Sequence, residues 1–162
     1  MLVAAFYMAF VGVMREKRHR LDALREICFA LELMKDELSC RSAPFPELFA
    51  ELIPHLSGAG KSLFQAVDRQ LPDLGEQDFA ALWAEAVEQS GPFLQRVERG
   101  SLDRLGLVLG RYELPVQIRE LDACLLFLRN RESEAAGQYP VQRRLGLGLA
   151  LSSGAILAIL LL

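Results

Sequence analysis

The sequence contains only two histidines and three cysteines among its 162 residues. Cys28, Cys40 and Cys124 lie far apart, and neither His19 nor His55 lies three or four residues from a cysteine or the other histidine. Metal sites built from these side chains commonly pair two ligands at short spacings. We therefore expect no metal site and no cofactor, and we expect Cys28 and Cys124, which fall on or beside apolar stripes, to behave as small hydrophobic residues.

An excess of positive charge is also lacking. The 18 lysines and arginines are outnumbered by 21 aspartates and glutamates, which gives a net charge of -3. A nucleic-acid-binding domain usually carries a strong basic excess, so nucleic acid is not an expected partner. No stretch alternates apolar and polar residues with β-branched enrichment, so we expect no strand and an all-α fold.

The chain ends in a long apolar run. Residues 145–162 read LGLGLALSSGAILAILLL and contain no charge and no proline. As a helix the run is about 27 Å long, close to the hydrocarbon core of about 30 Å. A buried core helix is the alternative, but such a helix normally has a polar face. We therefore predict a C-terminal transmembrane helix.

The chain also begins with an apolar run, at residues 1–14, and the basic cluster REKRHR follows it. A secretory signal has its positive charge before the apolar run and a small-residue cleavage site after it, so we predict an uncleaved anchor. At about 21 Å the run is short for a span. It either thins the bilayer or lies partly in the interface; a start codon further upstream would also account for its length.

Basic residues flank both runs on their inner sides. They are Arg15, Lys17, Arg18 and Arg20 after the first run, and Arg143 and Arg144 before the second. Basic residues near the ends of a span hold that flank in the cytoplasm. The sequence thus predicts a cytoplasmic domain at residues 15–140, with both termini facing away.

Helical periodicity organises this middle domain. Leu24, Ile27, Leu31, Met34 and Leu38 recur at spacings of three and four, so the anchor is expected to continue into a long amphipathic helix ending near Ser39. Further helices are expected at about 46–56, 61–71, 76–90, 101–109 and 115–138. Short connections favour an antiparallel bundle of about six helices. We expect its core to include Leu31, Leu52, Phe64, Trp83 and Leu125.

One stretch imitates a nucleotide site. Gly60, Lys61 and Ser62 match the end of a phosphate-binding loop, but His55 lies where that motif has its first glycine. A proline-containing amphipathic helix precedes the stretch, instead of the required buried strand. We interpret it as a turn between helices, with Lys61 at a helix start. A nucleotide-using enzyme stays open as an alternative that depends on Lys61 alone.

Other catalytic patterns are weak. No serine occupies a nucleophile elbow. The acidic residues Glu85, Glu88, Glu132 and Glu134 are expected on solvated helix faces, and Trp83 in the core, not against a ligand. We therefore expect no catalytic, cofactor-binding or metal-binding residues and no enzymatic activity.

Three stretches and the apolar tail carry a resemblance to a known family. The stretches are RLDALREICFALELMKDEL (20–38), LFAELIPHLSGAGKSLFQAV (48–67) and LGLVLGRYELPVQIREL (105–121). The third is the most specific, with a Leu-Gly-x-x-Leu-Gly-Arg signature and a following Gln-Ile-x-x-x-Leu helix. The chain resembles the stage III sporulation protein AB family, although its first span is shorter and Pro115 replaces a more polar turn residue.

The resemblance implies a non-catalytic component of the secretion-like channel complex between mother cell and forespore. It implies kinship to the platform proteins of type II secretion and type IV pilus machines. The implied partners are a separate cytoplasmic ATPase and other channel membrane proteins, and the implied location is the mother-cell membrane around the forespore. A helical signal-transduction adaptor stays open as an alternative.

A partner-binding site is expected at the turn of the third stretch. Gly110 is expected to end a helix with positive φ, which presents Arg111 at a loop tip. Gln117 follows in the next helix. We expect Gly110, Arg111 and Gln117 to contribute to partner binding; an arginine that is merely solvated is the alternative.

Overall fold

A computed structural model describes the backbone of residues 2–41, 44–73 and 77–160, and the side chains of residues 11–40, 44–72 and 77–137. Its α-helices are α1 (Leu2–Arg41), α2 (Phe45–Leu52), α3 (Gly58–Gln70), α4 (Phe79–Ser90), α5 (Arg96–Gly106) and α6 (Leu114–Leu160). Two 3₁₀ helices, Ile53–His55 and Leu71–Asp73, follow α2 and α3. The described part of the chain contains no strand, which confirms the all-α prediction of about six helices.

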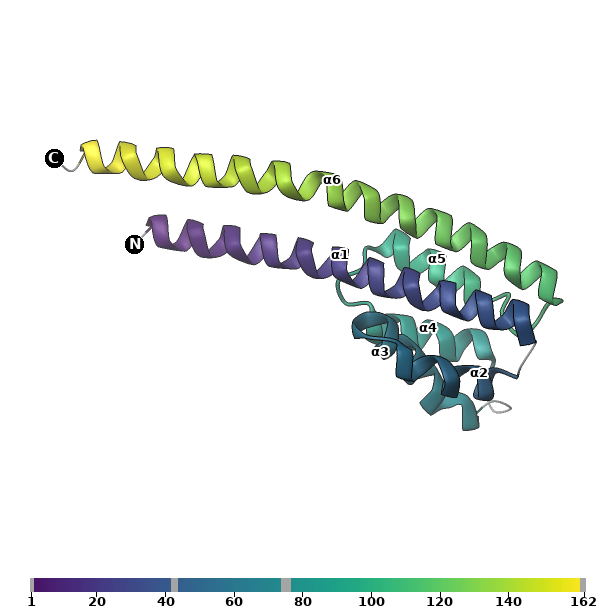
Figure 1. Cartoon of the computed structure of the whole chain (residues 1–162). Coiled ribbons are helices and arrows are strands. Elements are labelled where there is room, and N and C mark those ends of the chain that lie inside the picture. The colour runs from purple at the N-terminus through teal and green to yellow at the C-terminus, as the bar shows by residue number, and fades with distance from the viewer. Residues whose placement is uncertain (1, 42–43, 74–76, 161–162) are drawn as a thin grey trace.

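Two long helices frame the molecule. α1 and α6 run antiparallel, and both extend beyond the bundle at the end where the two chain termini lie (Figure 1). The packing neighbours form a closed ring, from α1 through α3, α4 and α5 to α6 and back to α1. α2 packs against α1 and α3. The shorter helices therefore pack at one end of the antiparallel pair formed by α1 and α6.

The stripe predicted on α1 is the face that the bundle buries. Leu24, Ile27, Leu31, Met34 and Leu38 are all buried. Their spacings of three and four bring them to one side of the helix, where burying each side chain removes apolar surface from water. The prediction of an amphipathic helix that continues from the N-terminal run is confirmed, because α1 has no break.

Aromatic rings fill the centre of the bundle. Phe64 and Trp83 meet edge to face with their centroids 6.1 Å apart, and Phe49 meets Phe64 in the same way at 5.3 Å. The indole Nε1 of Trp83 donates a hydrogen bond of 2.8 Å to the carbonyl of Leu102, so its one polar group is satisfied. The predicted core is confirmed: its members Leu31, Leu52, Phe64, Trp83 and Leu125 are buried.

Several predicted helix boundaries are wrong, and three of them are instructive. α3 begins at Gly58, not near Lys61, so the glycines expected in a turn belong to its first turn. α5 begins at Arg96, and the expected N-cap Ser101 lies in its middle. α6 continues past Gln138 and through Tyr139 and Pro140 without a break. In each case, contacts or helix continuity override the local preferences of glycine, serine and proline.

The predicted membrane segments are the apolar runs at residues 1–14 and 145–162. Within the residues searched, which are the described ones, no helix is sufficiently long and apolar to cross a membrane. The side chains of the predicted span 145–162, and most of those of the predicted anchor 1–14, lie outside the described residues.

Candidate functional site

The glycine-rich start of α3 is held against α1. The backbone N–H of Ala59 donates a hydrogen bond of 2.7 Å to Oε2 of Glu26, a side chain of α1. The first N–H groups of a helix have no partner within the helix and attract negative charge. Here a carboxylate of the protein occupies the position that an anionic ligand would take.

Close contact explains the two glycines beside this carboxylate. A Cβ on Gly58 would lie 2.0 Å from Glu26 Oε2, and Gly58 has a φ of 50°. A Cβ on Gly60 would lie 2.5 Å from the backbone oxygen of Glu26. The glycines thus allow α3 to approach α1. The element before α3 is a 3₁₀ helix, whereas a phosphate-binding loop follows a strand.

The structure brings two of the three predicted partner-binding residues together. Oε1 of Gln117 accepts a hydrogen bond of 3.3 Å from the backbone N–H of Gly110, and Gln117 Nε2 donates one of 2.7 Å to the carbonyl of Tyr112. Gly110 has a φ of 72°, as predicted, and a Cβ there would lie 2.8 Å from the Phe45 ring. Gly110 and Gln117 therefore shape the loop between α5 and α6.

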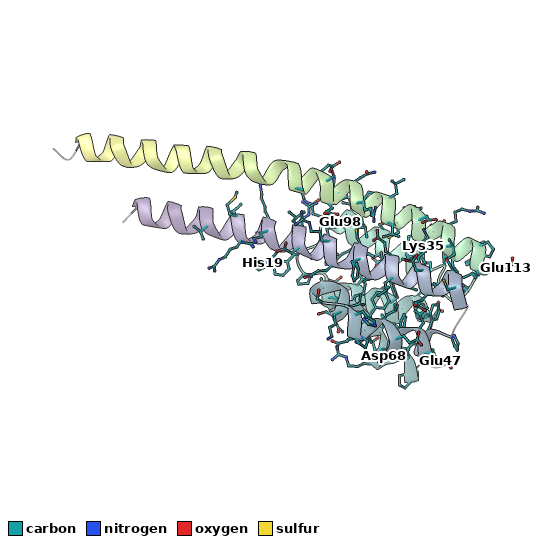
Figure 2. All side chains as sticks on the ribbon, in the orientation of Figure 1. His19, Lys35, Glu47, Asp68, Glu98 and Glu113 are labelled. Carbon is teal, nitrogen blue, oxygen red and sulfur yellow. The ribbon has the colours of Figure 1, made fainter. Side chains whose placement is uncertain are left out.

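Arg111 differs from these two residues. It is exposed, and no ion pair of its guanidinium is present in the described part of the chain. The neighbouring Tyr112 is 55% exposed. Glu113, which follows them, lies at the end of the bundle away from the termini (Figure 2). The loop therefore offers a cation and an aromatic ring at this distal end.

A buried ionic cluster joins three helices near the other end of the bundle. Glu98, on α5, is fully buried and pairs with Arg20 of α1 through both carboxylate oxygens. Arg131 of α6 lies beside it, with Nε 3.6 Å from Glu98 Oε1. Glu98 Oε2 also accepts a hydrogen bond of 2.7 Å from the backbone N–H of Gln95, and Arg131 donates one of 2.6 Å to Gln95 Oε1.

Sequence reasoning missed this cluster. Arg20 was interpreted only as part of a basic flank, and nothing in the local pattern marks Glu98 as buried. One signal was present: Gln95 and Glu98 have the spacing of an N-cap and its N3 residue, which would have placed the helix start correctly. The two arginines paired with Glu98 are 78 and 33 residues away in sequence, beyond any local pattern.

Two of the three cysteines lie in the packed interior. Cys28 and Cys124 are buried, Cys40 is exposed, and all three are free thiols. Burial, reinforced by Glu132 and Glu32, raises the pKa of Cys28 to about 12. Burial also raises the pKa of Cys124. Neither thiol is therefore a ready nucleophile near neutral pH. No group of three or more potential metal ligands occurs among the described residues.

A shallow groove of about 450 Å³ runs between α5 and α6. Its lining mixes Val97 and Phe127 with Arg104 and Glu120, and it includes Ser101, which donates a hydrogen bond to Cys124 Sγ. Three of the acidic residues expected on solvated helix faces form ion pairs: Glu88 with Arg99, Glu132 with Arg25, and Glu134 with Arg131.

Comparison with known proteins gives a consistent result. The sequence profile of the family described as Stage III sporulation protein AB matches residues 1–162. A solved structure named "Stage III sporulation protein AB (SpoIIIAB)" is similar, with a TM-score of 0.66 and 21% identity, and the match covers 75% of this chain and 97% of that chain. At that identity the structural likeness supports the fold alone. No protein of curated function matches the sequence.

Proposed function

Because the chain belongs to the stage III sporulation protein AB family, we propose that it is a non-catalytic, membrane-anchored component of a secretion-like channel complex between mother cell and forespore. The family match over the whole chain is the observation that carries the proposal. In this complex the bundle faces the cytoplasm of the mother cell and engages a separate ATPase.

The register of the two long helices supports the membrane anchoring. Arg25 pairs with Glu132 and Lys35 pairs with Asp122, so ten residues along α1 match ten residues in the opposite direction along α6. Extending this register by eleven residues sets Met14 level with Arg143. The ion pair between Glu32 and Arg129 is offset by four residues, about one helical turn. The end of the first apolar run and the start of the second therefore lie at nearly the same height along the helix pair.

The basic clusters then form one belt. Arg15 to Arg20 flank the first run and Arg143 with Arg144 flank the second. A belt of basic residues at the inner ends of two spans is the arrangement that keeps a domain in the cytoplasm. This supports a topology in which residues 15–140 lie on the cytoplasmic side and both termini on the other.

The distal loop is the proposed contact with the ATPase. Arg111 and Tyr112 directly precede Glu113, which lies at the end of the bundle away from the chain termini (Figure 2), where a cytoplasmic partner would have access. Arginine and tyrosine are enriched at the energetic centres of protein interfaces. Gly110 and Gln117 contribute indirectly, because they fix the shape of the loop.

Two other functions compete with this proposal. A nucleotide-binding enzyme depends on Lys61, and the carboxylate of Glu26 beside the α3 start disfavours a bound phosphate. Titration of the purified chain with labelled ATP tests this function, and saturable binding that is lost in Lys61→Ala would favour it. A signal-transduction adaptor would be favoured if the membrane-inserted chain dimerised through α1.

The proposal is tested by topology and by capture. After Cys28, Cys40 and Cys124 are replaced by Ala or Ser, Ser57→Cys introduces a thiol at an exposed position. We expect it to react with an impermeant maleimide only after permeabilisation of sporulating cells. Arg111→Glu should weaken co-purification of the ATPase, whereas Arg69→Glu, an exposed charge reversal on α3, should not. Labelling in intact cells, or equal capture by all versions, would contradict the proposal.

A further inference from the structure

An exposed aromatic ring lies in the loop between α4 and α5. Phe93 is 43% exposed, while the next residue, Leu94, is buried and its N–H bonds to the carbonyl of Gly91 at 3.0 Å. The ring of Phe93 stacks on that of His19 with centroids 5.0 Å apart and planes at 23°. The loop is thus fixed from inside, and it holds Phe93 outward beside α1.

The position of this ring along α1 indicates its depth relative to a bilayer that holds the proposed anchor. His19 lies five residues after Met14, the last residue of the predicted anchor, so it lies about 7.5 Å below it along the helix. A bilayer has a hydrocarbon core of about 30 Å and a total thickness of about 40–45 Å, so each headgroup layer is about 5–7.5 Å thick. Figure 2 shows His19 on α1 near the end of the bundle from which the long helices emerge. With the anchor proposed above inserted in a bilayer, the Phe93 ring, which stacks on His19, lies at the outer edge of the headgroup layer.

The charges at the same level are mostly positive. Arg15, Lys17 and Arg18 are exposed, and the one acidic residue between positions 11 and 21 is Glu16. Arg18 also lies 3.9 Å from Asp22, an exposed pair that contributes little. The loop itself, residues 91–95, contains no charged residue, and the exposed Arg96 follows it at the start of α5. This local excess contrasts with the net charge of -3 for the whole chain.

We propose that the loop around Pro92 and Phe93, together with Arg15, Lys17 and Arg18, forms a third membrane contact that binds the headgroups of anionic phospholipids. An aromatic ring is favoured at the membrane interface, and each basic residue near an anionic surface adds attraction. The contact rests on the proposed membrane anchoring and adds a lipid preference to it. It also fixes which side of the bundle faces the bilayer.

Fluorescence quenching on the full chain in lipid nanodiscs tests this contact. In a Cys40→Ser background, where the remaining thiols are buried, an environment-sensitive dye is placed at Pro92→Cys, next to the intact Phe93. Arg111→Cys, next to the exposed Tyr112 at the distal end, gives the matched control. Leu157→Cys, within the predicted C-terminal span, reports insertion of that span.

We expect the dye at position 92 to be quenched by lipids that carry a nitroxide at the headgroup, and to be several-fold less accessible to iodide than the dye at position 111. The protection should be greater in bilayers containing phosphatidylglycerol than in phosphatidylcholine alone. Phe93→Ser should reduce this protection of the dye from iodide. The triple change of Arg15, Lys17 and Arg18 to Gln should reduce it as well. The matched triple change of Arg69, Arg104 and Arg119 to Gln should leave it unchanged.

The result that would overturn the contact is a dye at position 92 as accessible to iodide as the dye at 111, while the dye at 157 is shielded by lipid. That outcome would leave the membrane anchoring intact. Exposure of position 157 to iodide would instead remove the anchoring itself, and the lipid contact with it.

Discussion

Oε2 of Glu26 accepts a hydrogen bond of 2.7 Å from the backbone N–H of Ala59, so a side chain of the first helix caps the start of the third. The contact explains a motif that looks like a nucleotide site in the sequence. Gly58 and Gly60 are present because two helices approach each other there, and the negative charge at the helix start belongs to the protein.

Replacing Gly60 with alanine should destabilise the bundle by about 1–3 kcal/mol, the usual range for overpacking a buried site. The added Cβ would lie 2.5 Å from the backbone oxygen of Glu26, which cannot rotate away. Gly100→Ala is the control, because a Cβ there meets nothing within 4 Å and alanine favours a helix. Chemical unfolding followed by fluorescence of Trp83, the one tryptophan, measures both. Equal stabilities of the two variants would contradict the close approach of α3 to α1.

Replacing Glu98 with leucine should cost about 3–5 kcal/mol, because Arg20 and Arg131 would lose a fully buried partner. Adding Arg20→Met should recover part of the loss, since the two changes remove charges that depend on each other. A double-mutant cycle on the free energy of unfolding measures this coupling. Glu88→Leu, which breaks the more exposed pair with Arg99, should cost no more than about 1 kcal/mol. Additive effects of the first two changes would show that the cluster does not join α1 to α5.

Trp83→Ala should cost about 3–5 kcal/mol, a large fraction of the stability of a small domain. The indole is fully buried, contacts Phe64 and Phe79, and lies against Gly106. The expected readout is loss of cooperative thermal unfolding in far-ultraviolet circular dichroism. Trp83→Phe retains a ring but loses the hydrogen bond to Leu102, so its loss should be smaller. A Trp83→Ala variant as stable as the native chain would show that the ring is not central to the core.

The thiols should differ sharply in reactivity. At pH 8 a maleimide should modify Cys40 alone in the native chain, and all three cysteines in denaturant. Unfolding releases Cys28 to ionise near its ordinary pKa of 9.0, whereas in the fold burial raises its pKa to about 12. The unfolded state therefore loses this proton first, and the free energy of unfolding should fall as pH rises from 9 toward 12. Cys28→Ala should reduce that slope; an unchanged slope would assign it to other groups.

The apolar patterns predicted most of the fold because they follow the geometry of a helix. The stripe from Leu24 to Leu38 and the inward position of Trp83 need only the period of 3.6 residues and burial. The positive φ of Gly110 is as predicted, although α5 ends at Gly106 and Gly110 lies in the turn that follows it, not directly after the helix. These features depend on residues that are near one another in the sequence.

The missed features depend on residues that are distant in the sequence. Glycine is a poor helix former, so Gly58 and Gly60 indicate a turn when the sequence is considered locally. In the structure they lie in the first turn of α3, because Glu26 of α1 accepts a hydrogen bond from the helix start. Ser101 is a good N-cap in isolation, yet Glu98 and Gln95 start the helix earlier. For the loop site, the sequence identified an exposed Arg111 but could not indicate that Gln117 hydrogen-bonds to Gly110.

The unbroken course of α1 has a mechanical consequence. The same helix that supplies a wall of the bundle core continues to Leu2 without an interruption, so no swivel separates the bundle from the N-terminal segment. The Glu98 cluster also joins α5 to both α1 and α6, so the bundle and the two long helices share one packed unit. A partner that turned the bundle would therefore turn α1 and α6 with it.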